Sequence, residues 1–263
     1  MALPSQRRRQ ILEEIQRAGA GAVSSLSARF DVSETTIRRD LRILEEEGAI
    51  ERTHGGAVTQ ASKINGLTII AREKRKSIQA AQKAKIARYV AREFIRDGDN
   101  IALEGGTTVS ALALHLVDKS ELTLVTNGLA LTNDLHAALR HHNDATILCC
   151  GGILRGVSST FVGPVAEQFF RGFHVSKLFL SATGLTLETG VSDPSMLETQ
   201  VKRAMIAAAG TVIVVMDSSK FGVKSLLTVL HVDEIDILVT DEGISDGFRQ
   251  ELVECGIDVR VAA

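Results

Sequence analysis

The first sixty residues contain the pattern that most constrains the fold, because three short stretches with helical spacing of apolar residues follow one another there. Glycines interrupt the pattern after the first stretch, and serines that can cap a helix open the second and third, at Ser24 and Ser33. Only a tight turn at Asp31 and Val32 separates the second stretch from the third. We therefore expect helices over residues 4–17, 24–30 and 34–47.

Residues 49–58 follow the third predicted helix and have the composition of a β-hairpin. Gly48 is expected to end the helix, and two short runs suited to strands then flank Gly55 and Gly56. The order helix, helix, turn, helix and two-stranded wing predicts a winged helix-turn-helix. That fold places its last helix in the major groove of double-stranded DNA.

The third predicted helix carries hydroxyl and guanidinium side chains on its first turns, where a helix in the major groove meets base edges. An N-cap serine would leave backbone N–H groups facing a phosphate. Ile37, Leu41 and Leu44 lie on the opposite face and are expected to pack on the first two helices. The wing side chains could contact the DNA backbone or the minor groove. The residues predicted to bind DNA are Ser33, Thr35, Thr36, Arg38, Arg39, Arg42, Arg52 and His54.

Two other interpretations of this region are open from the residues alone. A capped helix with two arginines can be an ordinary solvated surface helix, and a winged helix can serve protein contacts only. The complete order of elements, with the wing glycines at the right distance, argues against the first interpretation. The second remains as the alternative.

Charge is distributed unevenly along the chain. Residues 1–60 carry nine arginines and nine acidic residues, whereas residues 61–85 carry seven basic residues and one acidic residue. The formal net charge is −2, so the remainder from residue 86 must carry −8. Phosphate contacts need only a local positive face. The acidic remainder indicates that the second part of the chain does not lie on DNA.

From residue 78 onward, apolar runs of strand character alternate with helical patterns of about 10–15 residues. Such alternation predicts a mostly parallel sheet covered by helices on both faces. The polar stretch before it reads as a linker. We therefore predict an α/β protein with a winged helix-turn-helix over residues 1–60, a linker over 61–77 and an α/β domain over 78–263. The expected strands are 101–104, 122–126, 145–150, 177–182, 211–216 and 235–240.

The sequence lacks the signals of a membrane or secreted protein. We find no signal peptide, and no stretch approaches the ~18 apolar residues of a membrane span. Cys149, Cys150 and Cys255 lack the spacing of a disulfide framework or a zinc site, and His141 and His142 are adjacent, which is poor metal geometry. We expect a cytoplasmic protein with no membrane partner, no metal and no cofactor.

Several strand ends in the second region carry glycines and polar residues. Ligands bind at the carboxyl ends of parallel strands, and small-residue loops let N–H groups reach an anion. One such loop often only closes a βα connection, but the three that follow strands near residues 104, 126 and 150 together favour binding. Lys220 follows a further strand among hydroxyl side chains, and its position fits a phosphate or sugar contact and equally a plain turn. Glu198 and Lys202, four residues apart, predict an exposed ion pair on one helix face.

The chain also resembles a known family, the DeoR family of bacterial repressors, over nearly its full length. In the first region the resemblance rests on residues 32–48 and on Arg52 to Ala57 of the wing. In the second it rests on residues 97–99, 106–108, 125–127, 151–152, 163–164, 198–205 and 217–222. It implies a sensor domain after the winged helix-turn-helix, similar in fold to ribose-5-phosphate isomerase, that detects phosphorylated sugars or related metabolites.

The resemblance implies a transcriptional regulator, namely a repressor of a carbohydrate-metabolism operon that a phosphorylated sugar relieves. Its partners would be double-stranded operator DNA, the sugar phosphate effector and further copies of the chain, as a dimer or tetramer. Residues 78–263 would then be an effector-binding and oligomerisation domain. The predicted ligand-binding residues are Glu104, Gly105, Gly106, Thr107, Thr108, Thr126, Asn127, Gly151, Gly152, Lys202 and Lys220.

One departure from the family pattern and one competing function bear on this prediction. The strand before Gly106 usually ends in Asp followed by Ser, but it reads Glu104 and Gly105 here, so the family does not identify the effector. The competing function is a sugar-phosphate isomerase with a DNA-binding head. Such enzymes move protons with a strand-end carboxylate. The candidate strand end here, residues 181–184, carries none, so we expect binding without turnover and no catalytic residues.

Overall fold

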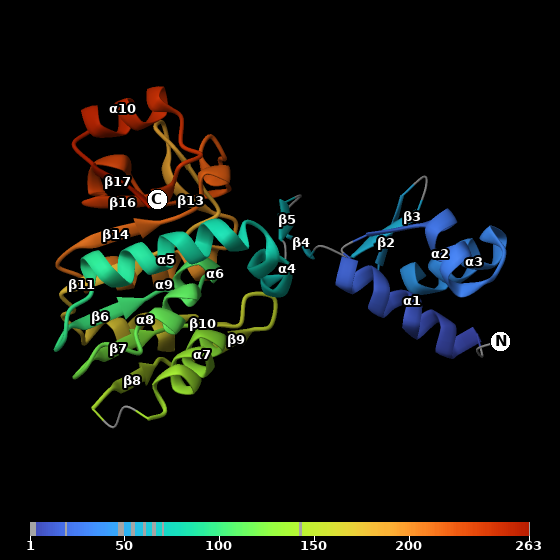
Figure 1. Cartoon of the computed structure of the whole chain (residues 1–263), viewed down its shortest axis with the longest axis horizontal. Coiled ribbons are helices and arrows are strands. Elements are labelled where there is room, and N and C mark those ends of the chain that lie inside the picture. Colours follow the sequence, from blue (N-terminus) through green and yellow to red (C-terminus); the bar gives the residue numbers. More distant parts are fainter. Residues whose placement is uncertain are drawn as a thin grey trace. The chain divides into compact units, whose positions relative to one another are not determined.

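The computed structural model describes residues 4–18, 20–46, 50–53, 56–59, 62–64, 67–69, 71–141 and 144–262. The chain divides into two compact units, Met1–Ile69 and Ile70–Ala263, and each is considered by itself (Figure 1). One apolar cluster forms the core of the N-terminal unit, and two clusters fill the C-terminal unit.

The N-terminal unit consists of three helices and an antiparallel three-stranded sheet in the order β1-β3-β2. Its elements are α1 (Pro4–Ala18), β1 (Ala20–Ala22), α2 (Val23–Phe30), α3 (Glu34–Glu46), β2 (Ile50–Thr53) and β3 (Gly56–Thr59). These elements confirm the predicted winged helix-turn-helix. The short strand β1 was not predicted. Gly56 permits it to pair with β3, because a Cβ on Gly56 would stand 2.2 Å from the carbonyl oxygen of Gly21.

The core of this unit explains the orientation of α3. Ile37, Leu41 and Leu44 are buried against α1 and α2, as their spacing predicted. Asp40 lies between them and is also buried, and its carboxylate accepts a hydrogen bond of 2.7 Å from Arg7 Nε on α1. This pairing satisfies the buried charge.

The predicted cap of α2 is wrong. The helix begins at Val23, with Ala22 rather than Ser24 in the N-cap position and without a side-chain cap. Val23, one position ahead of Ser24, is the first residue of the helix and is buried in the core. The predicted turn after α2 is confirmed, since Asp31 adopts a left-handed conformation with φ 49°.

A seven-stranded parallel sheet in the order β17-β16-β14-β11-β6-β7-β8 lies at the centre of the C-terminal unit. Six of its strands confirm the predicted apolar runs. The edge strand β17 was not predicted. The strands are β6 (Asn100–Leu103), β7 (Thr123–Thr126), β8 (Thr146–Cys149), β11 (Lys177–Leu180), β14 (Val212–Val215), β16 (Ile237–Asp241) and β17 (Asp258–Ala262).

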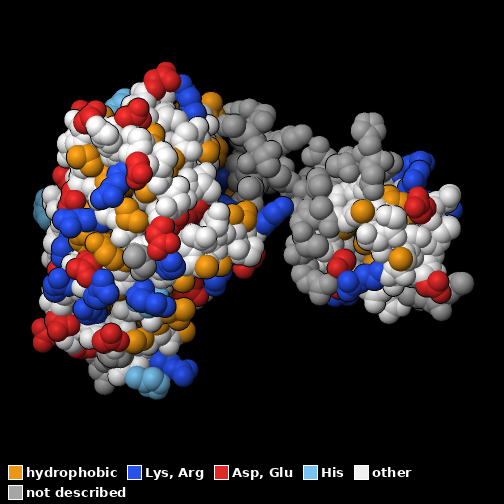
Figure 2. Space-filling view, turned by 45° about the horizontal axis from the view of Figure 1, so that its top comes forward, with side chains coloured by type: hydrophobic (Ala, Val, Ile, Leu, Met, Phe, Trp, Pro, Cys, Tyr) orange, Lys and Arg blue, Asp and Glu red, His pale blue; other side chains and the backbone are white. Residues whose placement is uncertain are grey.

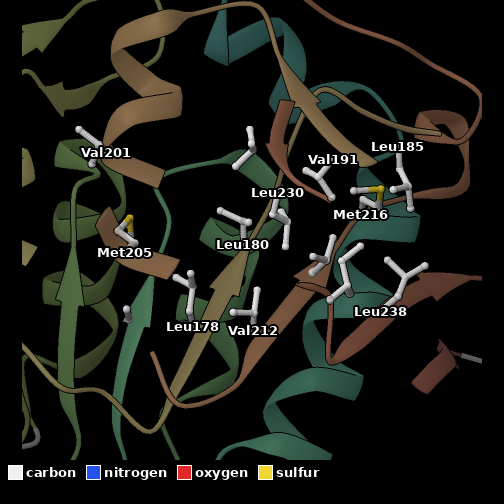
Figure 3. Packing of buried hydrophobic residues seen from close by; sticks show 14 of the residues in the cluster. Leu178, Leu180, Leu185, Val191, Val201, Met205, Val212, Met216, Leu230 and Leu238 are labelled. Carbon is white, nitrogen blue, oxygen red and sulfur yellow. The ribbon is translucent and has the colours of Figure 1, made fainter. Parts of the chain in front are cut away.

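Helices cover both faces of this sheet. Successive strand residues face opposite layers, so Leu178 and Leu180 belong to one core cluster and Phe179 to the other. Figure 3 shows Leu178 and Leu180 in the first cluster, which also contains Val201 and Met205 of α9. The helices are α5 (Ala80–Phe94), α6 (Thr107–Ser110), η1 (Ala111–His115), α7 (Leu129–Leu139), α8 (Pro164–Arg171), α9 (Met196–Ala207) and α10 (Asp246–Glu254).

Several short elements were not predicted, because three- or four-residue strands give no clear periodicity. They form a hairpin, β9 (Ile153–Arg155) with β10 (Thr160–Val162), and a three-stranded sheet of β12 (Gly184–Thr186), β13 (Gly190–Asp193) and β15 (Leu227–Leu230). Two short 3-10 helices are η2 (Ser218–Lys220) and η3 (Val232–Glu234). The stretch expected to be a linker contains β4 (Ser62–Ile64), β5 (Leu67–Ile69) and α4 (Arg72–Ser77).

Candidate nucleic-acid interface and effector site

Helix α3 begins at a side-chain cap, as its sequence predicted. Ser33 Oγ accepts a hydrogen bond of 3.3 Å from the backbone N–H of Thr36 and lies 2.9 Å from Thr36 Oγ1. The cap satisfies one of the four N–H groups that a helix start leaves unpaired. The remaining first-turn N–H groups stay available for an anion.

The predicted reading residues of α3 lie on one exposed face. Thr35, Arg38, Arg39 and Arg42 are exposed and recur at the spacing that aligns side chains along a helix. Thr36, which touches the cap, is half-buried. This face is open to a partner because the apolar face of the same helix is packed in the core.

Arg38, near the centre of this face, is held only by a weak surface ion pair. Arg38 Nη2 lies 2.9 Å from Glu34 Oε2, but both side chains are about half exposed. Solvent-exposed pairs of this kind contribute little free energy. Arg38 can therefore leave Glu34 for a phosphate or a guanine edge at small cost.

Two of the predicted DNA contacts, Arg52 and His54, belong to the wing. Arg52 belongs to β2, but its side chain lies outside the described residues. His54 lies wholly outside them. Both residues stay predictions.

In the C-terminal unit the loop after β6 is bonded to the loop after β7. The backbone N–H of Gly105 donates to Asn127 Oδ1 at 2.9 Å, and Gly128 N donates to Thr126 Oγ1 at 3.0 Å. Because β6 and β7 are neighbours in the parallel sheet, their carboxyl ends meet at one edge. The structure thus brings together Gly105 and Asn127, two of the residues predicted to bind the ligand.

Glycine is required in the first of these loops by close packing. A Cβ on Gly105 would stand 2.6 Å from Thr160 Cγ2 and 2.8 Å from the Cα of Gly128, and one on Gly106 would stand 1.9 Å from Ser181 Oγ. The departure from the family pattern at Gly105 therefore has a structural reason: a serine side chain does not fit against Thr160.

Glu104 turns into the protein rather than toward solvent. Its Oε2 accepts hydrogen bonds from Ser181 Oγ at 2.7 Å and from Gly106 N at 3.0 Å, and only 4% of the residue is exposed. The carboxylate fixes the glycine loop and joins the end of β6 to the end of β11. Its role in this geometry is to hold the loop.

Lys202 of α9 is the cation of a buried cluster with Glu104 and Asp193. Its Nζ lies 2.9 Å from Asp193 Oδ2 and 3.6 Å from Glu104 Oε1, and donates to the carbonyl of Ser181 at 2.9 Å. Burial alone lowers the pKa of Lys202, but Asp193 and Glu104 outweigh burial and raise the pKa above its ordinary value. The ammonium group is therefore charged and already occupied by the protein.

The predicted exposed ion pair between Glu198 and Lys202 is wrong. Both side chains point inward, since α9 packs against the sheet, and Lys202 is bonded to Asp193 instead. Glu198 Oε1 accepts from Thr160 Oγ1 at 3.1 Å and lies 4.0 Å from Arg155 Nε. Glu198 thus ties α9 to the β9–β10 hairpin.

Gly151 and Gly152 lie at the start of that hairpin and are exposed. Gly152 has φ +125°, a conformation that favours glycine, and a Cβ there would stand 2.7 Å from the carbonyl oxygen of Val162. The hairpin reaches the other loops through Thr160, which packs on Gly105. The two glycines thus lie at the start of the hairpin, and the conformation of Gly152 requires glycine there.

Lys220 ends η2, directly beyond β14, and is half-buried. The same turn is fixed by Asp241, whose carboxylate accepts hydrogen bonds from Ser218 N and from Ser218 Oγ, both at 2.8 Å.

The predicted residues Thr107 and Thr108 are the first residues of α6, and both are buried. Asp193, Ser181 and Arg155 were missed at the sequence level, because no local spacing signals them and only the folded sheet brings them to the site.

The described residues give no indication of a metal site or a membrane span. Among them we find no group of three or more His, Cys, Asp or Glu side chains that could hold a metal ion. None of the helices they form is long and apolar enough to cross a bilayer. In Figure 2 basic and acidic side chains are interspersed over the visible face of the C-terminal unit, unlike a surface that binds DNA.

Fold and site together define a regulator with a DNA-reading head and a sensor domain. Residues 7–63 match the DeoR-like helix-turn-helix domain and residues 78–242 match the DeoR C terminal sensor domain. The chain belongs to the DeoR family of transcriptional regulators.

Curated relatives cover almost the full chain. The chain is 36% identical to the transcriptional repressor AccR of Agrobacterium fabrum, over 90% of this chain and 89% of that protein. It is 32% identical to the HTH-type transcriptional regulator GlpR of Haloferax volcanii, over 98% and 97%. A solved ribose 5-phosphate isomerase from Plasmodium falciparum is similar over 53% of this chain and 52% of its own, with 9% identity and a TM-score of 0.38, and carries no conclusion about activity.

Proposed function

We propose that this chain represses a carbohydrate-metabolism operon and that a phosphorylated sugar, bound in the C-terminal unit, relieves the repression. The observation that carries the proposal is the convergence of the loops after β6 and β7, bonded through Gly105 and Asn127, at the carboxyl edge of the sheet. Ligands of parallel α/β sheets bind at this edge. The name of the similar protein AccR supports repression as the output.

Operator DNA would be read by the exposed face of α3. Thr35, Thr36, Arg38 and Arg39 would reach base edges from the first turns of the helix, and Arg42 would contact phosphates. Arg52 and His54 of the wing would add backbone or minor-groove contacts. Ser33 leaves the helix start open to a phosphate.

The effector would sit at Gly105–Thr108, Asn127 and Lys220, with Gly151 and Gly152 at the hairpin side. Thr126 and Glu104 hold these loops in place through the bonds described above. Lys202 would support the site without touching the effector, because its ammonium group is bonded to Asp193 and to the carbonyl of Ser181.

We propose that the site binds its sugar phosphate without turnover. Isomerisation needs a carboxylate free to take a proton from a sugar carbon. Glu104 and Asp193 are both buried and both lie within ion-pair distance of Lys202. Neither is available as a base in this arrangement.

The regulator would act in the cytoplasm as a dimer or tetramer formed through residues 78–263, with residues 1–60 as the DNA-binding domain. Two recognition helices on repeated half-sites require at least two copies. Sedimentation of the purified chain would give the number of copies.

The test is a thermal-shift screen of the full chain against pentose and hexose phosphates, each beside its unphosphorylated sugar. At a concentration of 100 times Kd, a bound ligand stabilises the folded state by about 2.7 kcal/mol. We expect at least one phosphate to raise the melting temperature and its parent sugar to have a much smaller effect. Operator fragments selected by the full chain from genomic DNA should then be released by that phosphate. A screen in which no phosphate stabilises the chain, or in which one is catalytically isomerised, would overturn the proposal.

A further inference from the structure

Three cations near the strand ends have no ion-pair partner. They are Arg75 on α4, Lys83 in the first turns of α5 and Lys220 on η2. Within the part of the chain that the structure describes, no carboxylate oxygen lies within 4.0 Å of their charged nitrogens. The nearby Arg72 has two carboxylate partners within this distance, Glu73 and Asp134, and Lys85 has one. Unpaired cations away from water are costly unless an anion joins them.

Lys83 is at the centre of this group. Only 5% of the residue is exposed, and its Nζ donates to the backbone carbonyl of Arg75 at 2.5 Å. Burial lowers the pKa of Lys83 to about 8, Asp217 partly offsets this effect, and Lys220 and Arg75 lower the pKa further. Three positive charges thus face one carboxylate.

Two polar atoms in the same place are buried without a partner. Among the described residues, Arg75 Nε and Asp217 Oδ2 are buried and make no hydrogen bond. Asp217 is 1% exposed, and its other oxygen accepts from Ser219 Oγ. Buried groups without partners are rare and call for a reason. A bound molecule with both acceptor and donor oxygens would satisfy them.

This cationic group lies beside the predicted effector loops. Helices α4 and α5 both pack against α6, whose first residues are Thr107 and Thr108, and Figure 1 shows the three helices together. Arg72 fixes α4 there: its Nη2 donates to Ser110 Oγ on α6 at 2.8 Å, and its backbone N–H donates to the carbonyl of Val157 at 2.9 Å.

We infer that Arg75, Lys83 and Lys220 bind a phosphate monoester as a dianion. The inference rests on the proposed function, and it names the residues that hold the phosphate end of the effector. The dianion neutralises the excess of two positive charges and gives Arg75 Nε an acceptor, and a hydroxyl group of the esterified sugar would donate to Asp217 Oδ2. Lys220 was predicted from the sequence, whereas Arg75 lies in the stretch that was expected to be a linker. The segment next to the DNA-binding unit therefore takes part in recognising the ligand.

The experiment is a calorimetric titration of the full chain with inorganic phosphate, with pentose and hexose monophosphates, and with the parent sugars. The variants are Lys83→Met and Arg75→Met, with Lys85→Met as the matched control, because Lys85 is a half-exposed lysine paired with Glu242 at 3.2 Å. Lys83→Met replaces a desolvated charge by an apolar chain of similar length, so it should fold. We expect either test variant to weaken binding of every phosphate by about tenfold or more, and the control by less than about twofold.

The outcomes separate the inference from the proposed function. If Lys83→Met and Arg75→Met bind a sugar phosphate as tightly as the unchanged chain does, the inference is wrong and the proposed function stands. The inference also fails if parent sugars bind as tightly as their phosphates. If the unchanged chain binds neither inorganic phosphate nor any sugar phosphate, both fail. Binding of inorganic phosphate as tight as that of any sugar phosphate supports the anion site and contradicts a sugar effector.

Discussion

Helix α3 and the proposed effector site at the strand ends (Gly105–Thr108, Asn127 and Lys220, called the strand-end site below) differ in how their polar residues are paired. On α3 the predicted contacts are exposed and loosely paired, as Arg38 is with Glu34. At the strand ends they are buried and bonded to one another, as Glu104 is to Ser181 and Lys202. A helix that enters a DNA groove needs hydrogen-bond donors that are free to contact the DNA. In a small-molecule site, most polar side chains instead bond to one another and hold the loops in position. A polar residue near a ligand is therefore not by itself a ligand contact.

The largest effect is expected from substitutions on the exposed face of α3. Arg38→Ala combined with Arg39→Ala should reduce operator affinity by about 100-fold or more, since each base-reading arginine contributes about 1–3 kcal/mol. Thermal stabilisation by the sugar phosphate should be unchanged. Fluorescence anisotropy at fixed salt measures the first effect.

The control for this variant is Arg9→Ala, which removes an exposed arginine with a similar pairing, to Glu13 at 3.1 Å on α1. It should change operator affinity little. Normal operator binding by the Arg38 and Arg39 double variant would show that α3 is not the reading helix.

Lys202→Met tests the buried cluster. The substitution leaves Glu104 and Asp193 without their cation, and breaking a buried pair costs about 3–5 kcal/mol of unfolding free energy. Urea denaturation measures the loss. Lys224→Met removes an exposed lysine that lies 3.5 Å from Glu188, and should cost less than about 1 kcal/mol. Equal effects of the two substitutions would mean that the cluster does not hold the loops.

Gly105→Ser restores the residue type that the family usually carries. Its Cβ would meet Thr160 Cγ2 at 2.6 Å, so we expect a loss of about 1–3 kcal/mol from overpacking. Gly151→Ser is the control, because a Cβ there has nothing within 4 Å. A fully stable Gly105→Ser variant would contradict the steric explanation of the departure.

A pH dependence of the free energy of unfolding arises from Lys83. Its pKa of about 8 lies below the ordinary value of 10.5, so the penalty of the buried charge is fully present below pH 8. The unfolded chain binds more protons between these values, and stability of the ligand-free chain should rise as pH increases from 8 toward 10.5. Asp217, Lys220 and Arg75 are the charged groups that act on Lys83.

Denaturation curves of the unchanged chain and of Lys83→Met across this range measure the effect as a difference. The variant should lack part of the rise in stability. Phosphate affinity should fall over the same range as Lys83 loses its proton. Identical pH profiles of the two proteins would show that Lys83 does not cause the pH dependence of stability.

The two regions also differ in how far their sequence predicts them. Local signals define α3: Ser33 caps it, and the spacing of Ile37 and Leu41 fixes its buried face. Apolar runs likewise predict six strands of the parallel sheet. The strands β1, β9 and β10 were missed because three residues carry no periodicity.

The partners within the strand-end site could be predicted only in part. Asn127 was found because it directly follows a strand, and the parallel sheet places it beside Gly105. The pairing of Lys202 with Asp193 depends on how α9 packs beneath the sheet, which residue spacing does not encode. In the sequence Arg75 is one of several charged residues in a polar stretch, and only the packing of α4 on α6 brings it to the site.

The central claim is that the DNA-reading unit and the strand-end site are coupled. The most direct test is operator affinity with and without a saturating sugar phosphate, for the unchanged chain and for Thr107→Ala combined with Lys220→Ala. The ligand should lower the operator affinity of the unchanged chain by about 5–150-fold, the range of typical coupling energies. The variant should bind operator normally and not respond. A ligand that binds the unchanged chain yet leaves its operator affinity the same would contradict the claim.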